Sequence, residues 1–265
     1  ALASGKHPFA KQLKKAKKPM VIVGMGALRR ADGSAVMALC HQLAEGVGMV
    51  TADWNGFNVL HHAAARVAGL DLGFVPGKGG KDVQGILSAA TKGEMDFVWL
   101  LGADELDTDM VAKPFVVYQG HHGDKGAQCA DVVLPGAAWA EKDGLYVNFE
   151  GRVQMARRAA FPPGDAREDW AILRAFSETI NKTLSFDSLN ELRKQMVAEV
   201  PVFAKLDEIQ PAKWAKFGRT AKVKSESVEA GLDEFYMTSA ISRASETMAE
   251  CYQANQAGKS AIAAE

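Results

Sequence analysis

The amino-acid sequence predicts an α/β protein, with a mostly parallel, doubly wound sheet followed by a helical or irregular C-terminal tail. Three apolar runs, at 96–104, 115–120 and 131–136, each have the length of one strand. Their nearly continuous hydrophobic character is typical of parallel strands that are buried on both faces. Helical patterns alternate with the predicted strands, which implies right-handed crossovers between parallel neighbours.

The N-terminal part begins with a helix, a strand and a second helix. Residues 1–18 are rich in lysine and form a basic lead-in, which we expect to be helical with a solvated charged face. The run MVIV at 20–23 predicts a buried strand, and residues 32–45 carry apolar side chains at helical spacing. Asp32 or Ser34 would cap this second helix, because both residue types accept hydrogen bonds from free backbone N–H groups.

The segment that follows is less regular. Residues 49–51 predict a second strand, whereas residues 52–81 are rich in Gly, Asn and His and predict only a short helix near 59–67. So long an irregular segment is unusual in a compact domain, so we expect it to be functional or to cover a neighbouring protein. Residues 83–93 then predict a helix that ends at a glycine.

Two helices are predicted from capping signals in the second half of the chain. Asp165 and Glu168 have the spacing of a capping box before a clear helical pattern. Ser188 and Glu191 repeat this spacing before another helix, which Pro201 would stop.

These patterns divide the chain into three parts. We expect the basic lead-in at 1–18, an α/β domain at 19–182 and a helical and extended tail at 183–265. Within the tail, residues 201–234 predict an extended segment over a surface, and residues 235–255 predict one terminal helix.

Composition excludes several classes of protein. The chain has 265 residues, 48% of them hydrophobic and 24% charged, as expected of a globular protein with a core. Its formal net charge of −1 provides no general attraction to nucleic acid. The apolar runs are too short to span a membrane. The three cysteines are far apart, which favours a reducing compartment and cannot supply an all-cysteine iron–sulphur cluster.

Two motifs have the residue types of binding sites but lack the full pattern. Gly24-x-Gly26 follows a strand, as in a dinucleotide-binding loop, but the third glycine position is Arg29, so a tight strand-to-helix turn is favoured. His121 and His122 could converge with Asp124 and Cys129 on a loop. Zinc ligands normally occur in pairs at regular spacing, which is absent here, so a metal site is disfavoured. The same holds for the pair His61 and His62, and the role of all four histidines stays open.

The remaining candidates for chemistry are three carboxylates and a thiol. Glu141, Asp143 and Glu150 could supply a pair for acid–base catalysis, although turn and surface roles are favoured because Lys142-Asp143-Gly144 is typical of a turn. Cys129 lies among small residues with no identifiable base, which favours a buried and inert thiol.

The longest ordered motif is ADVVLPGAAWAEKDGLYVNFEGRVQ, at residues 130–154, called here the 130–154 motif. It resembles a motif of the molybdopterin oxidoreductase fold, in which ADVVLP is followed by E-K-x-G and then by N-x-E-G-R-x-Q. The resemblance implies a sheet of the molybdopterin oxidoreductase type and a former cofactor cradle. The matching positions that we retain as a vestigial cradle are Asp131, Pro135, Glu141, Lys142, Asn148, Glu150, Gly151 and Arg152.

The flanking segments narrow the resemblance. YQGHHGDKGA at 118–127, PPGDAREDW at 162–170 and FYMTSAISRASETMAEC at 235–251 are similar to the large iron–sulphur subunit of respiratory complex I, in its mitochondrial and alphaproteobacterial form. Residues 183–265 lack the strands of the β-rich domain that closes over the pterin in true molybdopterin enzymes. We therefore expect this chain to be the C-terminal portion of such a subunit, whose 2Fe-2S and 4Fe-4S clusters are bound by an N-terminal region.

The resemblance implies a scaffold with no catalytic residue, cofactor or metal in this segment, within an enzyme that passes electrons from NADH to ubiquinone and translocates protons. The implied partners are other subunits of the hydrophilic arm, including the NADH-binding flavoprotein and the subunits near the quinone site, but not nucleic acid. The implied location is the matrix side of the mitochondrial inner membrane or the cytoplasmic face of a bacterial plasma membrane.

In the 130–154 motif, Arg152 would bind a nearby carboxylate and Asn148 would bind loop backbone groups. The alternatives are a fragment of a molybdopterin enzyme similar to formate dehydrogenase, and a nucleotide-binding module.

Overall fold

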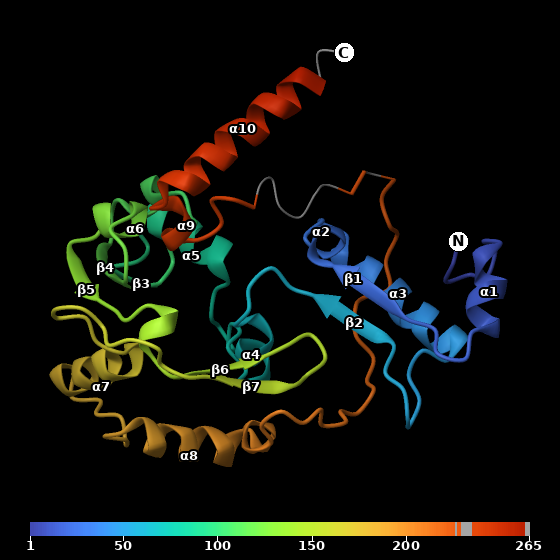
Figure 1. Cartoon of the computed structure of the whole chain (residues 1–265), viewed down its shortest axis with the longest axis horizontal. Helices are drawn as coiled ribbons and strands as arrows, with labels where there is room; N and C mark the ends of the chain where they lie inside the picture. The colour runs from blue at the N-terminus through green and yellow to red at the C-terminus, as the bar shows by residue number, and fades with distance from the viewer. Residues whose placement is uncertain (226, 229–234, 263–265) are drawn as a thin grey trace. The chain divides into compact units, whose positions relative to one another are not determined.

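The structure, a computed structural model, describes residues 1–225, 227–228 and 235–262. Figure 1 shows the helices and strands along the chain. The chain divides into two compact units, and the boundaries between them cut the sequence several times. Unit 1 contains Ala1–Ala68, Tyr146–Gln154 and Lys205–Asp233; unit 2 contains Gly69–Leu145, Met155–Ala204 and Glu234–Glu265. The linear boundaries that the sequence suggests at 18/19 and 182/183 stay a prediction.

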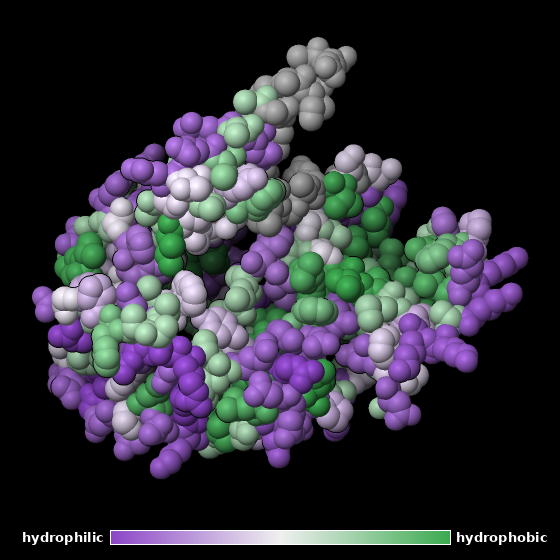
Figure 2. All heavy atoms as spheres, viewed as in Figure 1, coloured by the Kyte–Doolittle hydropathy of each residue, from purple (hydrophilic) through white to green (hydrophobic). Residues whose placement is uncertain are grey.

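Unit 1 is built on a pair of parallel strands, β1 (Val21–Gly24) and β2 (Phe57–Leu60). Helices α1 (Phe9–Lys15), α2 (Met25–Leu28) and α3 (Gly33–Val47) precede β2 in the chain. The core joins Leu43, Ala44 and Met49 to Val21 and Phe57, so α3 packs against the strand pair. The lysines of α1 are exposed, and Figure 2 shows a largely hydrophilic surface over this helix.

The segment 49–81 differs from the sequence prediction. Val50 forms only an isolated bridge with Asn55, so residues 49–51 are not a strand; they begin a turn in which the Gly56 N–H donates to the Met49 carbonyl at 2.7 Å. The second strand is instead β2, inside the segment expected to be irregular. A helix, α4 (Arg66–Asp71), lies close to the predicted one.

Unit 2 contains the three-stranded parallel sheet that the apolar runs predict. Its strands are β3 (Phe97–Leu101), β4 (Phe115–Gly120) and β5 (Val132–Pro135), in that spatial order. Leu87 and Ala90 of α5 (Val83–Lys92) pack with alternate residues of β3 and β4 on one face. On the opposite face, Trp99 contacts Phe176 of α7 (Asp169–Thr179), with ring centroids 4.7 Å apart. Helices therefore cover both faces, and the α/β class with parallel strands is confirmed.

The other elements are 3 to 17 residues long. They are the 3-10 helices η1 (Thr108–Val111), η2 (Trp139–Glu141) and η3 (Pro201–Ala204), helices α6 (Lys125–Gln128), α8 (Leu189–Glu199), α9 (Ala240–Arg243) and α10 (Glu246–Ile262), and strands β6 (Gly144–Val147) and β7 (Val153–Ala156), which form a two-stranded sheet. The described residues of the tail after 183 hold helices and extended segments but no named strand. Residues 226, 229–234 and 263–265, which belong to the predicted tail, lie outside the described residues.

The predicted helix caps have different outcomes. The hydroxyl of Ser188 accepts the Glu191 N–H at 3.3 Å, as expected. The predicted capping box of Asp165 and Glu168 is not formed, so this prediction is wrong. Helix α7 begins at Asp169, and the Glu168 side chain makes no capping hydrogen bond. Asp32 stands at the N-cap position of α3, but its carboxylate binds other partners.

The predicted terminal helix at 235–255 is two helices, α9 and α10. The chain turns at Ala244 and Ser245, where the Ser245 hydroxyl accepts the Met248 N–H at 3.4 Å. This serine starts α10 in the way that a cap starts any helix, because it satisfies a backbone N–H that has no partner within the helix.

Candidate functional site

The 130–154 motif is divided between the two units. Residues up to Leu145 belong to unit 2, and residues from Tyr146 belong to unit 1. The candidate site residues therefore fall into two groups, each described within its own unit.

The first group lies around β5. The carboxylate of Asp131 accepts the backbone N–H of Val116 at 2.7 Å, which connects the start of β5 to β4. At the other end of β5, the carbonyl of Pro135 accepts the Arg167 N–H at 3.0 Å, and the next residue, Gly136, donates to the Gly120 carbonyl at 2.7 Å. Asp131 thus connects the start of β5 to β4, whereas Pro135 connects the end of β5 to the backbone of Arg167.

The turn after β5 uses the carboxylates proposed for acid–base chemistry. Glu141 accepts the Ala138 N–H at 2.9 Å, and Asp143 accepts the Arg158 N–H at 2.8 Å. Glu150 belongs to unit 1, whereas the other two belong to unit 2. Each of Glu141 and Asp143 holds a neighbouring loop in place through a backbone N–H, which is the turn role favoured by the sequence.

Lys142 has a partner that the sequence does not predict. Its ammonium group donates to one carboxylate oxygen of Asp169, the first residue of α7. The other oxygen accepts the side-chain amide of Gln119 at 2.9 Å. Gln119 is fully buried, and its amide oxygen has no partner among the described residues. The polar residue in the run FVVYQG is the one sequence signal that could have indicated this network.

The second group forms the loop between β6 and β7. The side-chain oxygen of Asn148 accepts the N–H groups of both Glu150 and Arg152 at 3.0 Å, so the loop-binding role predicted for Asn148 is present. Gly151 has a φ of +85°, a conformation that favours glycine. Arg152 donates to the carbonyl of Asp207, while its nearest contact with Glu150 is 3.9 Å. Arg152 therefore keeps a long ion pair with the local carboxylate of Glu150, while its short hydrogen bond goes to the backbone of the segment after 205.

Of the four candidate histidines, His121 and His122 are in direct contact. The Nδ1 atoms of His121 and His122 are 2.6 Å apart, so one nitrogen donates a hydrogen bond to the other. Burial lowers the pKa of His121, and the nearby charges of His122 and Lys142 lower it further. Burial, followed by the charges of Arg66 and His62, also lowers the pKa of His61. Both effects favour neutral imidazoles.

The other candidates have structural surroundings. Gly24 is the N-cap of α2, so Gly24-x-Gly26 is a strand-to-helix turn. The thiol of Cys129 contacts the Gly126 carbonyl at 3.4 Å, and burial raises its pKa, which lowers its reactivity. No group of three or more His, Cys, Asp or Glu side chains gathers in a metal-binding arrangement among the described residues. Within that same part of the chain, no helix has the length and apolar character to cross a bilayer.

A molybdopterin cofactor carries phosphate and needs free donors and positive charge. A cavity of about 270 Å³ in unit 1 touches the 130–154 motif at Asn148 and Gln154 and is otherwise lined by Leu60, His61, Ala63, Ala64, Val67, Tyr146, Val147 and Phe149. This lining contains no lysine or arginine. The charged or amide side chains of the retained motif positions already have partners within the chain. Neither this cavity nor the retained motif positions therefore offers the free donors and positive charge that this cofactor needs.

Comparison with known proteins assigns the fold family. The family model described as molybdopterin oxidoreductase matches residues 1–179. The chain therefore belongs to the molybdopterin oxidoreductase family. A second family model, which describes the C-terminal part of the G subunit of NADH-ubiquinone oxidoreductase, matches residues 208–251.

The similar curated proteins carry the names of NADH-quinone and NADH-ubiquinone oxidoreductase subunits. The chain is 41% identical over 255 residues to the G subunit of NADH-quinone oxidoreductase from Rickettsia bellii (strain RML369-C). It is also 41% identical over 253 residues to the NADH-ubiquinone oxidoreductase 75 kDa subunit of Reclinomonas americana. These alignments cover 96% and 94% of this chain and 36% of each relative. The chain thus spans about a third of the length of the curated relatives that it matches.

Proposed function

We propose that this chain is the scaffold portion of the large iron–sulphur subunit of respiratory complex I. The observation that carries the proposal is its 41% identity, along nearly its whole length, to the bacterial G subunit and to the 75 kDa subunit. The match of residues 208–251 to the family model for the C-terminal part of the G subunit supports the same conclusion for the tail. The parent enzyme would transfer electrons from NADH to ubiquinone and translocate protons, while this segment would perform no chemistry.

The contacts of the 130–154 motif support a structural role. Its polar side chains bind backbone groups and carboxylates of the same chain, and they hold strands and loops in place. In this proposal, Asp131, Pro135, Glu141, Lys142, Asn148, Glu150, Gly151 and Arg152 are the remains of a cofactor cradle. The 2Fe-2S and 4Fe-4S clusters would be bound elsewhere in the parent subunit.

The partners would be other hydrophilic-arm subunits, including the NADH-binding flavoprotein and those near the quinone site. The arm would lie on the matrix side of the mitochondrial inner membrane or on the cytoplasmic face of a bacterial membrane. One surface suited to such docking is the exposed apolar run of Leu70, Leu72, Phe74 and Val75, in which Phe74 is 85% exposed. Exposed apolar clusters of this kind mark interaction sites.

A docking test follows from that surface. Phe74→Asp in the full-length subunit should reduce incorporation into the native complex, because a charge in a buried apolar contact is costly. Lys92→Ala, a change at an exposed position of α5, is the matched control. Native electrophoresis of membranes would measure incorporation. Equal incorporation of Phe74→Asp and Lys92→Ala would exclude the run at 70–75 as a docking surface.

The family match favours one alternative, a molybdopterin enzyme similar to formate dehydrogenase. Molybdenum analysis of the purified native complex separates the two proposals. The scaffold proposal predicts no stoichiometric molybdenum, whereas about one metal per chain would support the alternative.

A further inference from the structure

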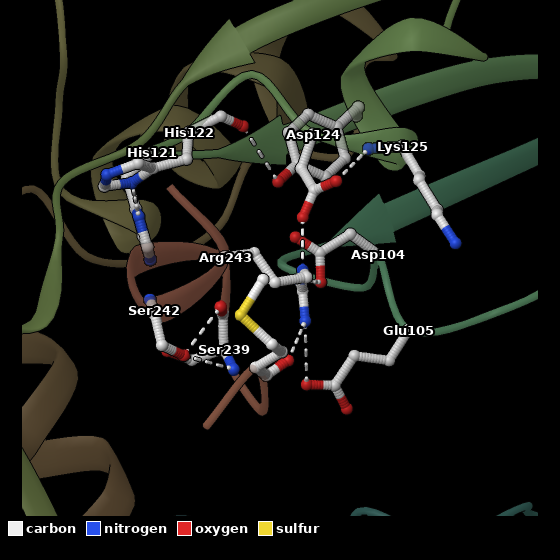
Figure 3. A network of polar contacts seen from close by, with 11 residues as sticks. Asp104, Glu105, His121, His122, Asp124, Lys125, Ser239, Ser242 and Arg243 are labelled. Atoms are coloured by element: carbon white, nitrogen blue, oxygen red, sulfur yellow. Dashed lines mark hydrogen bonds and ion pairs between the residues drawn. The ribbon is translucent and has the colours of Figure 1, made fainter. Parts of the chain in front are cut away.

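Arg243 makes a cluster of contacts that neither the 130–154 motif nor the proposed function explains. From the end of α9, its guanidinium donates to the carboxylate of Asp104 at 2.8 Å and to that of Asp124 at 2.5 Å. Glu105 lies 3.8 Å away, and the carbonyl of Met237 accepts a further hydrogen bond at 3.3 Å. Figure 3 shows the guanidinium between the side chains of Asp104 and Asp124.

The cluster lies at the carboxyl ends of two neighbouring parallel strands. Asp104 follows the end of β3, and Asp124 follows the end of β4, its neighbour in the sheet. The carboxyl ends of adjacent parallel strands are the place where α/β folds bind ligands. Arg243, more than a hundred residues further along the chain, occupies that place in unit 2.

The chemistry of the cluster suits a guanidinium group. The side chain of Asp104 is 6% exposed, and a carboxylate buried to that extent requires a charged or hydrogen-bonding partner. Arginine presents several N–H donors in one plane, so a single guanidinium can bind two carboxylates and a carbonyl at once. The hydrogen bond from Arg243 is also the main reason why the pKa of Asp124 is lowered.

The backbone before Arg243 supports the same contact. Ser239 and Ser242 form a capping box: each hydroxyl accepts the other residue's N–H, at 3.2 and 3.0 Å. A helix as short as α9 is not stable alone in water. Its geometry therefore depends on this cap and on the anchoring of its last residue.

We propose that the carboxyl ends of β3 and β4 form a guanidinium-binding site, which the chain fills with its own Arg243. This contact fastens residues 235–243 to the sheet and closes the position where a ligand of the ancestral fold would bind. The inference goes beyond the proposed function and does not depend on it, because it concerns contacts within unit 2 alone.

Hydrogen exchange of the full chain tests this proposal. Arg243→Ala should raise the exchange rates of the backbone amides in 236–243 about tenfold or more, because charge-assisted hydrogen bonds are lost. Arg243→Lys should restore only part of the protection, since an ammonium group cannot bind in the same fork. Added guanidinium chloride at low millimolar concentration should restore protection in Arg243→Ala, whereas equal concentrations of sodium chloride or urea should not.

Unchanged exchange in Arg243→Ala would overturn the proposal, as would rescue by guanidinium chloride that is no greater than rescue by sodium chloride or urea. Glu105→Gln is the matched control, because within the described part of the chain Glu105 makes only the long contact, and exchange in this variant should resemble that of the unmodified chain. If Arg243→Ala does not fold, Asp124→Asn preserves the bond to the more buried Asp104. It should still raise exchange in 236–243 several-fold, and unchanged exchange in this variant would contradict the proposal equally.

Discussion

The ammonium group of Lys142 donates to the carboxylate of Asp169, so a lysine of the 130–154 motif binds the first residue of α7. The same carboxylate accepts the amide of the fully buried Gln119. One carboxylate thus connects the strand β4, the turn after β5 and the start of a helix. A lysine held in this way supports the structure of unit 2 and is not available to a bound phosphate.

Replacement of Asp169 should destabilise unit 2. Asp169→Ala removes the partner of Lys142 and leaves the buried amide of Gln119 without its short hydrogen bond, so the free energy of unfolding should fall by about 1–3 kcal/mol. Asp165→Ala is the matched control, because its side chain is 99% exposed. The control should change stability by no more than about 0.5 kcal/mol. Urea denaturation measures both, and equal stability of the two variants would contradict the network around Asp169.

Asp32 should make unit 1 sensitive to acid. Hydrogen bonds from the guanidinium of Arg30 and from the N–H of Lys224 hold the pKa of Asp32 well below its usual range. The unfolded chain binds a proton at about pH 3.9, whereas the folded chain does so only at lower pH. The stabilisation is therefore complete above that pH and is lost as the pH falls towards the folded pKa.

The test compares the unmodified chain with Asp32→Asn. Near neutral pH, Asp32→Asn should be the less stable protein, and the difference should shrink progressively below about pH 4. Denaturant titrations at several pH values measure this difference. A difference that stays constant down to strongly acidic pH would show that the carboxylate of Asp32 is not the titrating group.

His121, like Asp32, should favour its deprotonated form in the folded chain. Burial, with the charges of His122 and Lys142, lowers its pKa, so the folded chain favours the neutral imidazole. As the pH falls below about 6.5, the unfolded chain binds a proton that the folded chain does not, and stability decreases. His121→Gln should therefore weaken the pH dependence of stability below that value. Identical dependence in both proteins, measured by denaturation across this range, would rule out His121 as its source.

Gly218 should be intolerant of a side chain because it lies against α3. It has a φ of +77°, and a Cβ there would lie 2.4 Å from the backbone N of Ala38 and 2.6 Å from the carbonyl of Ser34. Gly151 has a similar φ of +85°, but a Cβ at that position would meet nothing within 4 Å. Both alanine variants share the cost of a left-handed backbone, so Gly218→Ala should be less stable than Gly151→Ala by about 1–3 kcal/mol. Thermal or urea unfolding measures the difference, and equal losses would argue against close packing of residue 218 on α3.

The sequence predicts best the elements whose signal is local. Strands β3, β4 and β5 are continuous apolar runs of strand length, and the helix α5 ends at Gly93, which has the left-handed conformation typical of a C-cap. Strand β2 is not predicted because the polar Asn58, which is buried, interrupts its apolar run. Strands β1 and β5 are equally short but contain no polar side chain, so their runs are recognised.

The contacts that the sequence could not predict join residues far apart in the chain. Asp32 has the residue type and position of a helix cap, but Lys224, 192 residues away, and Arg30 bind its carboxylate instead. Arg243 and Asp104 are separated by 139 residues. Local propensity determines which residues can form such bonds, whereas tertiary packing determines which partners they find. The motif resemblance identified the family because it depends on the order of residues and not on their contacts.

The central claim is that this chain is a scaffold within respiratory complex I. Its most direct test is native electrophoresis of membranes from cells in which the full-length subunit carries an affinity tag, with NADH dehydrogenase activity stained in the gel. The account predicts that the tag comigrates with a large band that oxidises NADH. A tag found only in a smaller assembly without that activity would contradict it.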